Sequence, residues 1–227
     1  FLKKFMNDSR IEKKFLIEPS SNEKYIKIIK SLPFKIKKKY NSRQVNNIYL
    51  DTQLNQSLID HLDGINKRYK CRVRWYGDFY DFNSPVLEFK MKTNQVTEKK
   101  KIYLFNKQTS KFDTNKENFL SFISKQLQEN MMVNFIKNHK VSRIIIYKRD
   151  YYESLTKNIR FTIDKDLEYK LWVNNKIKKD TSRNFMHKNF NIIEAKYDFK
   201  LKYILPYLVN AFKLKSQSYS KFVDYRF

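Results

Sequence analysis

The chain has 227 residues, 41% of them hydrophobic and 16% aromatic, which is enough apolar material for a folded core and argues against a disordered protein. Its 48 Lys and Arg against 23 Asp and Glu give a formal net charge of +25, which attracts anionic ligands and favours phosphate-rich partners. A general bias of the composition toward Lys, Asn, Ile and Tyr is the alternative explanation of this charge.

Three features that the sequence lacks narrow the class of protein: an internal disulfide, a zinc site and a membrane-spanning helix. The one cysteine, Cys71, cannot form an internal disulfide, and His61, His139 and His187 do not have the spacing of a zinc site. No stretch approaches the roughly 18 consecutive apolar residues that a membrane-spanning helix needs. We therefore expect a cytoplasmic protein that segments or partners outside this chain could hold at the inner face of a membrane. The sequence does not predict the oligomeric state.

Strands dominate the expected secondary structure. With 2 Gly and 4 Pro in the chain, there is no linker and no repeat, so we expect a single domain over residues 1–227. Alternation of apolar and polar residues predicts an antiparallel sheet or barrel. The expected strands are residues 10–17, 45–51, 68–76, 86–92, 98–105, 142–152, 159–165 and 191–198.

Helices are expected between these strands. Ser20 and Glu23 have the spacing of a capping box, which predicts a helix that Pro33 ends. Gly64 allows the left-handed conformation that follows a helix, and Pro206 is placed to begin one. The expected helices are residues 22–32, 55–63, 115–131 and 206–214.

Charged residues gather on one face of each strand, because side chains two residues apart point to the same side. The sorting is complete in residues 68–75, where four cations alternate with Tyr69, Cys71, Val73 and Trp75. A half-buried sheet with a wet outer face is the alternative explanation. If helices instead cover the apolar faces of a closed barrel, the cations line its lumen, which must then hold water or a polyanion.

These residue types suit a site for phosphate chains. Guanidinium groups bind two phosphate oxygens at once, and lysines add point charge. A divalent ion shared by a carboxylate and phosphate oxygens would neutralise the transferring phosphoryl group. Glu194 is the first candidate ligand, with Glu12 and Glu88 as partners or as counter-charges to neighbouring lysines. An ordinary cross-strand ion pair is the alternative for each glutamate.

Several short motifs, taken in order, resemble one known family. They are Glu12-Lys-Lys14-Phe, Arg72-Val-Arg74, Leu87-Glu88-Phe-Lys90, Tyr147-Lys-Arg149, Arg160-Phe-Thr-Ile-Asp164, Glu194-Ala-Lys196 and Ser220-Lys221-Phe222. Together they resemble the catalytic domain of the vacuolar transporter chaperone (VTC) polyphosphate polymerases, within the CYTH or triphosphate tunnel metalloenzyme superfamily. The resemblance covers about residues 10–222.

The resemblance implies an α+β fold with a closed eight-stranded antiparallel β-barrel and helices packed outside. It implies an ATP-dependent phosphotransferase that moves the γ-phosphate of ATP onto a growing polyphosphate chain, with Mn²⁺ or Mg²⁺ in the tunnel. ATP and polyphosphate are then the partners, with no specific nucleic acid. Arg72, Arg74, Lys90, Arg149 and Arg160 would bind the nucleotide. The residues that the family motifs place in the catalytic site are Lys14, Arg72, Arg74, Lys90, Arg149, Arg160, Lys196 and Lys221.

Two alternatives remain open. A tripolyphosphatase or nucleoside triphosphatase would use the same barrel with water as the attacking group, and a non-catalytic polyanion-binding module would keep the cations without a working metal site. Arg10 stands where hydrolytic members of the superfamily favour glutamate, which favours the polymerase. Phe222 replaces a tyrosine that is usual in the last motif. The run Lys99–Lys101 is expected to form mainly a solvated strand edge.

Overall fold

The computed structural model describes residues 10–94, 96–104, 112–127, 136–180 and 190–223. Its helices are α1 (Asn22–Ser31), α2 (Gln56–Leu62), α3 (Lys116–Gln126) and α5 (Ile204–Phe212), with short 3-10 turns η2 (Pro19–Ser21) and η3 (Phe199–Leu201). Its strands are β1 (Arg10–Ile17), β2 (Ile36–Thr52), β3 (Lys67–Tyr76), β4 (Val86–Thr93), β5 (Val96–Tyr103), β6 (His139–Ser154), β7 (Ile159–Val173), β8 (Lys176–Lys179) and β9 (Asn191–Asp198).

The strands form one hydrogen-bonded sheet, in the order β1-β9-β7-β6-β2-β3-β4-β5, with β8 paired to β7. Every pairing whose register is resolved is antiparallel, such as β1 with β9 and β3 with β4. Among the described residues no hydrogen-bonded pairing joins β1 to β5, so the closed barrel is not confirmed. An antiparallel, sheet-rich α+β fold is confirmed.

The chain divides into two compact units, and the long strands β2, β6 and β7 contribute residues to both. Unit 1 contains residues 1–43, 147–167 and 185–219, and unit 2 contains residues 44–146, 168–184 and 220–227. Each unit has its own hydrophobic core. The expectation of a single domain stays a prediction.

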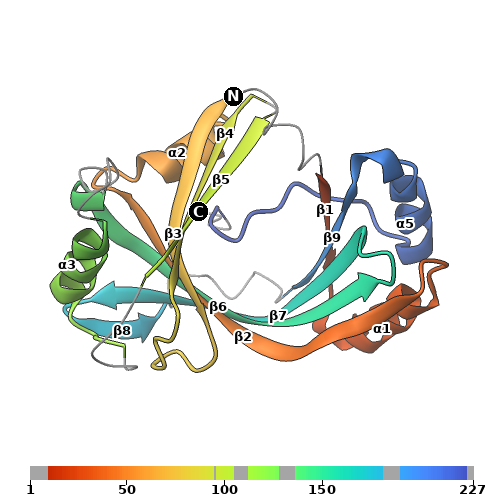
Figure 1. The fold of residues 1–227 in the computed structure, drawn as a ribbon, viewed down its shortest axis with the longest axis horizontal. Coiled ribbons are helices and arrows are strands. Elements are labelled where there is room, and N and C mark those ends of the chain that lie inside the picture. The colour runs from red at the N-terminus through yellow and green to blue at the C-terminus, as the bar shows by residue number, and fades with distance from the viewer. Residues whose placement is uncertain (1–9, 95, 105–111, 128–135, 181–189, 224–227) are drawn as a thin grey trace. The chain divides into compact units, whose positions relative to one another are not determined.

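Helices α1 and α5 cover the apolar face of the unit 1 strands, and they lie together beside β1 and β9 (Figure 1). Phe15 of β1 and Phe161 of β7 are fully buried there, because alternation turns them toward the helices. Phe212 of α5 packs edge-to-face on Phe15, with ring centroids 5.0 Å apart. The opposite face of these strands is left for polar residues.

Helix α3 covers the apolar face of unit 2 (Figure 1). Its N-cap is Asn115, whose side chain accepts hydrogen bonds from two backbone N–H groups of the first turn. Trp75 of β3 and Phe119 of α3 belong to the same buried aromatic cluster, in which Phe112 stacks on Trp75 at 5.6 Å. The fully buried thiol of Cys71 lies on this face too, and burial raises its pKa.

Most predicted elements are confirmed, with differences at their ends. The strands over residues 10–17 and 191–198 have the predicted bounds. Strand β2 begins at Ile36, nine residues earlier than predicted. The prediction missed this part of the strand because residues 37–43 show no alternation of apolar and polar side chains. Strand β8 was not predicted. Residue 105 of the predicted strand 98–105 and residues 128–131 of the predicted helix 115–131 lie outside the described residues.

Three details of the helix predictions are corrected or confirmed. The predicted capping box at Ser20 does not form, because Pro19–Ser21 is a 3-10 turn and Ser21 is the N-cap of α1, with no side-chain cap hydrogen bond. Helix α5 begins at Ile204, so Pro206 lies in its first turn, where a missing N–H costs little. Gly64 has the expected positive φ of 70°.

The helix cover of unit 1 yields a stability prediction. Phe212→Ala removes a fully buried ring, and we expect it to lower the free energy of unfolding of the chain by about 3 to 5 kcal/mol. Tyr203→Ala is the matched control, because this nearby aromatic residue is 65% exposed and a surface change costs about 0.5 kcal/mol or less. Urea unfolding followed by circular dichroism measures both. Equal losses in the two variants would contradict the described packing.

Candidate functional site

Two glutamates and two lysines meet on the polar face of unit 1, and we call Glu12, Lys14, Glu194 and Lys196 the Lys196 cluster. Lys14 Nζ lies 3.0 Å from Glu12 Oε1 and donates a 2.8 Å hydrogen bond to the Tyr219 carbonyl. Lys196 forms an ion pair with Glu194, and its Nζ lies 3.5 Å from Glu12 Oε2. One ammonium group thus joins two carboxylates.

Strand register brings this cluster together. Lys196 is the cross-strand partner of Glu12 and Glu194 that of Lys14, so the two Glu-x-Lys motifs of β1 and β9 run antiparallel and place opposite charges side by side. On the other edge of β9, Arg160 pairs with Lys196 and Thr162 with Glu194. The sequence pattern therefore fixes both the face and the neighbours of each charge.

Two arginines of unit 1, one on β6 and one on β7, are held by buried carboxylates. Arg149 binds Asp164 through two nitrogens, with Nη2 2.7 Å from Oδ2, and Asp164 is fully buried. Arg160 Nη2 and Nε lie 2.8 Å and 3.1 Å from Glu153 Oε1. Such two-point contacts fix the plane of a guanidinium group.

Ionisation in unit 1 follows these contacts. Burial lowers the pKa of Lys196, but the charges of Glu194 and Glu12 outweigh it and raise the pKa above the ordinary value. Burial raises the pKa of Glu153, but its contacts with Lys39 and Arg160 lower it below the ordinary value. These groups are therefore charged near neutral pH.

Glu88 is the centre of the polar face of unit 2, and we call Arg72, Arg74, Glu88 and Lys99 the Glu88 cluster. Arg72 donates to Glu88 Oε2 from Nε at 2.8 Å and from Nη2 at 2.6 Å. Arg74 Nη1 lies 3.7 Å from the same oxygen, and Lys99 Nζ lies 3.1 Å from Oε1. Three cations from β3 and β5, the two strands that flank β4, surround one carboxylate.

The closeness of these charges shifts the pKa values of Glu88 and Lys99. Burial raises the pKa of Glu88, but Arg72, Arg74 and Lys99 together lower it well below its ordinary value of 4.5. For Lys99, burial outweighs the attraction of Glu88 and lowers the pKa. Lys99 therefore lies on the polar face and not only at a solvated strand edge, which makes it a further candidate for the site. The sequence did not single it out, because residues 98–103 alternate too weakly to distinguish one lysine of the run from its neighbours.

Uncharged residues hold the arginines of unit 2 in place. Arg74 Nε donates to Asn47 Oδ1 at 2.9 Å, and Asn47 Nδ2 donates to the Ile145 carbonyl, also at 2.9 Å. Arg72 Nη1 donates to the Tyr49 hydroxyl at 3.0 Å. Asn47 and Tyr49 lie on β2 two residues apart, a spacing that could have revealed them in the sequence.

The segment Ser220 to Phe222 is bound by the polar face of unit 2. Lys70 Nζ donates to Ser220 Oγ at 2.8 Å, and Arg143 Nη1 donates to the Phe222 carbonyl at 2.7 Å. The Phe222 ring is buried and packs on Tyr49, with ring centroids 4.9 Å apart. Lys221 is therefore carried by an anchored segment.

The structure groups the sequence-predicted residues in two sets. Unit 1 contains Lys14, Arg149, Arg160 and Lys196 with Glu12 and Glu194, and unit 2 contains Arg72, Arg74, Lys90 and Lys221 with Glu88. Lys90 lies on β4 opposite Lys70 and Lys99. Sequence reasoning gave no role to Lys39, Asn47, Tyr49 or Glu153, although Glu153 lies four residues after Arg149 and therefore on the same face of β6.

The carboxylates differ in how well they fit a divalent ion. The described residues contain no group of three or more metal-ligand side chains, but Mg²⁺ is commonly held by one or two carboxylates together with substrate phosphates. Glu194 and Glu12 fit this pattern, because their carboxylates lie close enough together to share the ammonium group of Lys196. Glu194 is also the cross-strand partner of Thr162, whose buried hydroxyl has no hydrogen-bond partner among the described residues. Glu88 fits less well, because its cations favour the role of counter-charge.

Comparison with known proteins agrees with the fold. Residues 9–225 match the family model of the VTC domain. No curated protein matches the chain in a sequence search. A proposed adenylate cyclase from Vibrio parahaemolyticus superposes with a TM-score of 0.52 at 9% identity, over 93% of this chain and 94% of that one. A proposed adenylyl cyclase from Hippeastrum, reported to have a dominant triphosphatase activity, gives 0.52 at 14% identity, over 94% and 92%. Both likenesses show the fold alone.

The Glu88 cluster yields a prediction on stability and pH. Because the folded protein holds the pKa of Glu88 below 4.5, the ionised carboxylate stabilises the fold above that pH, and this contribution is lost as the pH falls below it. We expect Glu88→Gln to lower the free energy of unfolding at pH 7 by about 3 kcal/mol, and by less in acid. Urea unfolding across acidic and neutral pH measures the difference.

Glu98→Gln is the control, because this residue is an exposed carboxylate on the neighbouring strand β5. We expect it to change the free energy of unfolding by no more than about 0.5 kcal/mol at any pH. A Glu88→Gln loss that stays constant from neutral to acidic pH would contradict the described ion pairs.

Proposed function

Because this chain belongs to the VTC domain family, we propose that it is a polyphosphate polymerase, which transfers the γ-phosphate of ATP to the end of a polyphosphate chain. The proposal includes the closed, basic tunnel typical of this family and a bound Mn²⁺ or Mg²⁺. The observation that carries it is the Lys196 cluster, where cations for phosphate and carboxylates for a metal ion occupy one face of two paired strands.

The cations would bind phosphate oxygens with little rearrangement. Arg149 and Arg160 are already oriented by Asp164 and Glu153, so binding does not have to order these side chains first. Lys14 and Lys196 add charge that adapts to a moving phosphate chain, since an ammonium group has no preferred plane. In unit 2, Arg72 and Arg74 have the same kind of support from Glu88, Tyr49 and Asn47.

Glu194, with Glu12, would hold the divalent ion. When bound, this ion supplies positive charge at the γ-phosphate. Lys14 and Lys196 together match the charges of Glu12 and Glu194, so the cluster itself is charge-balanced. The side chain of Glu194 is 7% exposed, which keeps water away from the carboxylate and strengthens its attraction for cations.

No side chain has to act as a nucleophile in this reaction. The terminal phosphate oxygen of a polyphosphate chain is already an anion, so alignment and neutralisation of charge can carry the transfer. The bond that forms joins this oxygen to the γ-phosphorus of ATP, the bond that breaks joins the γ-phosphorus to the bridging oxygen, and ADP leaves. The residues of both clusters therefore act by binding and orientation.

Hydrolysis is the competing activity, because the Hippeastrum protein of similar fold is reported to have a dominant triphosphatase activity. There, water would take the place of the polyphosphate end. The first strand favours the polymerase, since it carries Arg10 where the family's hydrolytic relatives favour a second glutamate. The products distinguish the two: long phosphate chains come from a polymerase and free phosphate from a hydrolase.

Replacing Glu194 separates an enzyme from a binding module. We expect Glu194→Gln to lower turnover of ATP with Mn²⁺ at least a hundredfold, while binding of tripolyphosphate, measured by calorimetry, changes less than about tenfold; a loss of about 2.7 kcal/mol in the transition state corresponds to the first figure. Asp166→Asn is the control, because this carboxylate is exposed and pairs with the exposed Lys148. Unchanged turnover in Glu194→Gln would favour the binding module.

Removal of divalent ions tests the role of the metal in turnover without a mutation. We expect EDTA to stop formation of both polyphosphate and free phosphate, and an excess of Mn²⁺ to restore the original product. Tripolyphosphate should still bind in EDTA, because the lysines and arginines remain charged. Undiminished turnover in EDTA would contradict a role for a divalent ion.

A further inference from the structure

Large apolar side chains gather on the surface of unit 1, outside the site described above. A cavity of about 380 Å³ is lined by Phe34, Leu155, Leu201 and Tyr203, among others. Tyr203 is 65% exposed and Leu155 54%. Two more aromatic residues adjoin them: Phe199 in η3, which is 54% exposed, and Tyr207, which packs on Phe34. We call Phe34, Leu155, Phe199, Tyr203 and Tyr207 the docking face.

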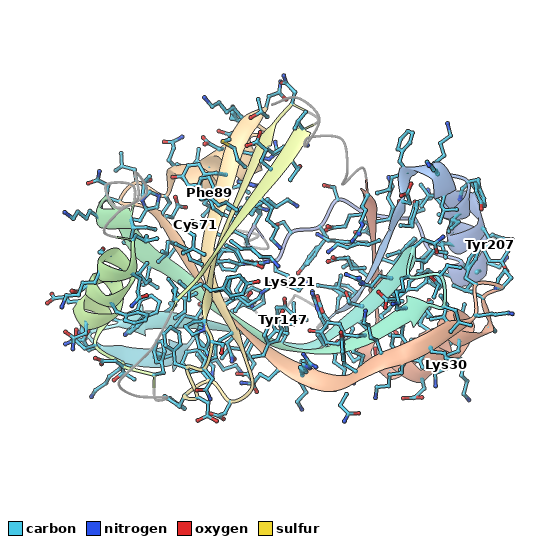
Figure 2. All side chains as sticks on the ribbon, viewed as in Figure 1. Lys30, Cys71, Phe89, Tyr147, Tyr207 and Lys221 are labelled. Atoms are coloured by element: carbon cyan, nitrogen blue, oxygen red, sulfur yellow. The ribbon has the colours of Figure 1, made fainter. Side chains whose placement is uncertain are left out.

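Four of these side chains lie exposed on the surface of unit 1, whereas Phe34 also packs partly against its core. In α5, Ile204, Leu208 and Phe212 are buried against the strands, and Tyr203 and Tyr207 lie on the other side of the helix. Figure 2 shows Tyr207 at the outer side of α5. Clustered exposed apolar groups of this kind commonly mark a binding surface, whereas single exposed ones need no explanation.

Lysines surround the docking face. The three segments that form it, residues 31–38, 154–158 and 199–213, contain no Asp or Glu. Lys35 lines the cavity, Lys157 lies in the turn beside Leu155, and Lys200 and Lys202 flank Leu201; all four are exposed. The Nζ of Lys202 lies 5.7 Å from the centre of the Phe199 ring. The carboxylate next to these segments, Asp198, is half-buried and accepts a hydrogen bond from the backbone N–H of Lys200. The surface therefore combines exposed aromatic rings with an excess of positive charge.

We propose that the docking face binds the surface of an anionic lipid bilayer. Aromatic rings prefer the boundary between headgroups and acyl chains, and lysines extend their ammonium groups to anionic headgroups from there. Apolar insertion and attraction to anionic lipids together hold a protein on a membrane without spanning it. No described helix is long and apolar enough to cross a membrane.

Charge disfavours a second copy of this chain as the occupant. Two identical docking faces would bring Lys35, Lys157, Lys200 and Lys202 of each copy together with no acidic residue in these segments to neutralise them. The inference is independent of the proposed function, since none of the docking-face residues belongs to either charged cluster.

Vesicle sedimentation tests the proposal with the 227-residue chain. We expect it to bind vesicles of phosphatidylcholine mixed with phosphatidylserine far more tightly than vesicles of phosphatidylcholine alone. Lys200→Gln with Lys202→Gln should weaken binding to the anionic vesicles roughly fivefold for each lysine. Lys178→Gln with Lys179→Gln removes the same charge from the exposed strand β8 and should have a much smaller effect. Equal losses in the two double variants would overturn the proposal, because diffuse net charge would then explain binding.

Removal of two exposed aromatic rings tests how much apolar insertion contributes to vesicle binding. We expect Phe199→Ser with Tyr203→Ser to weaken binding to the anionic vesicles at least tenfold, because two side chains no longer insert. Tyr80→Ser with Tyr103→Ser is the control, since these residues are 55% and 63% exposed on unit 2. Circular dichroism checks that both variants fold, and ATP turnover should not change. Binding that survives loss of Phe199 and Tyr203, or no binding of the parent chain to anionic vesicles, would overturn the proposal.

Discussion

Buried carboxylates make the cationic faces of this protein stable. Like charges on one face of a sheet repel each other, and the cost grows as they lose contact with water. Glu88, Glu153, Asp164 and Glu194 are each less than a tenth exposed, and each holds one or more lysines or arginines. The same contacts set the direction of the guanidinium groups, so stability and readiness to bind phosphate have one physical origin.

The division of each strand into two faces explains the rest of the fold. Helices α1, α5 and α3 bury the apolar faces, and this burial provides the driving force that offsets the cost of collecting charge on the other side. A polyanion or metal-bound phosphate would meet faces whose cations are charged at neutral pH and whose geometry is already set. The family match shows that this chain belongs to the VTC domain family, whereas the solved structures of similar fold, at 9% and 14% identity, support the architecture alone.

Sequence reasoning succeeded where periodicity is strong. Strands β1 and β9 and the cations of β3 could be read directly, because apolar and charged residues alternate there with few exceptions, such as Lys13 and Ile192. It failed at residues 37–43 of β2, which are exposed on both faces and so show no pattern. The ion-pair partners could not be predicted either. Alternation places Glu88 on the polar face, but only the side-chain contacts across β3, β4 and β5 show that Arg72, Arg74 and Lys99 converge on it. Closure of the barrel depends on contacts between strands distant in sequence, which no local pattern encodes.

A crystal structure of the chain with Mn²⁺ and a non-hydrolysable ATP analogue tests the central claim most directly. The account predicts that the terminal phosphates lie within hydrogen-bond distance of Lys14 and Lys196, with the ion bound to Glu194. A nucleotide bound elsewhere, with Lys14 and Lys196 making no contact to phosphate, would contradict it.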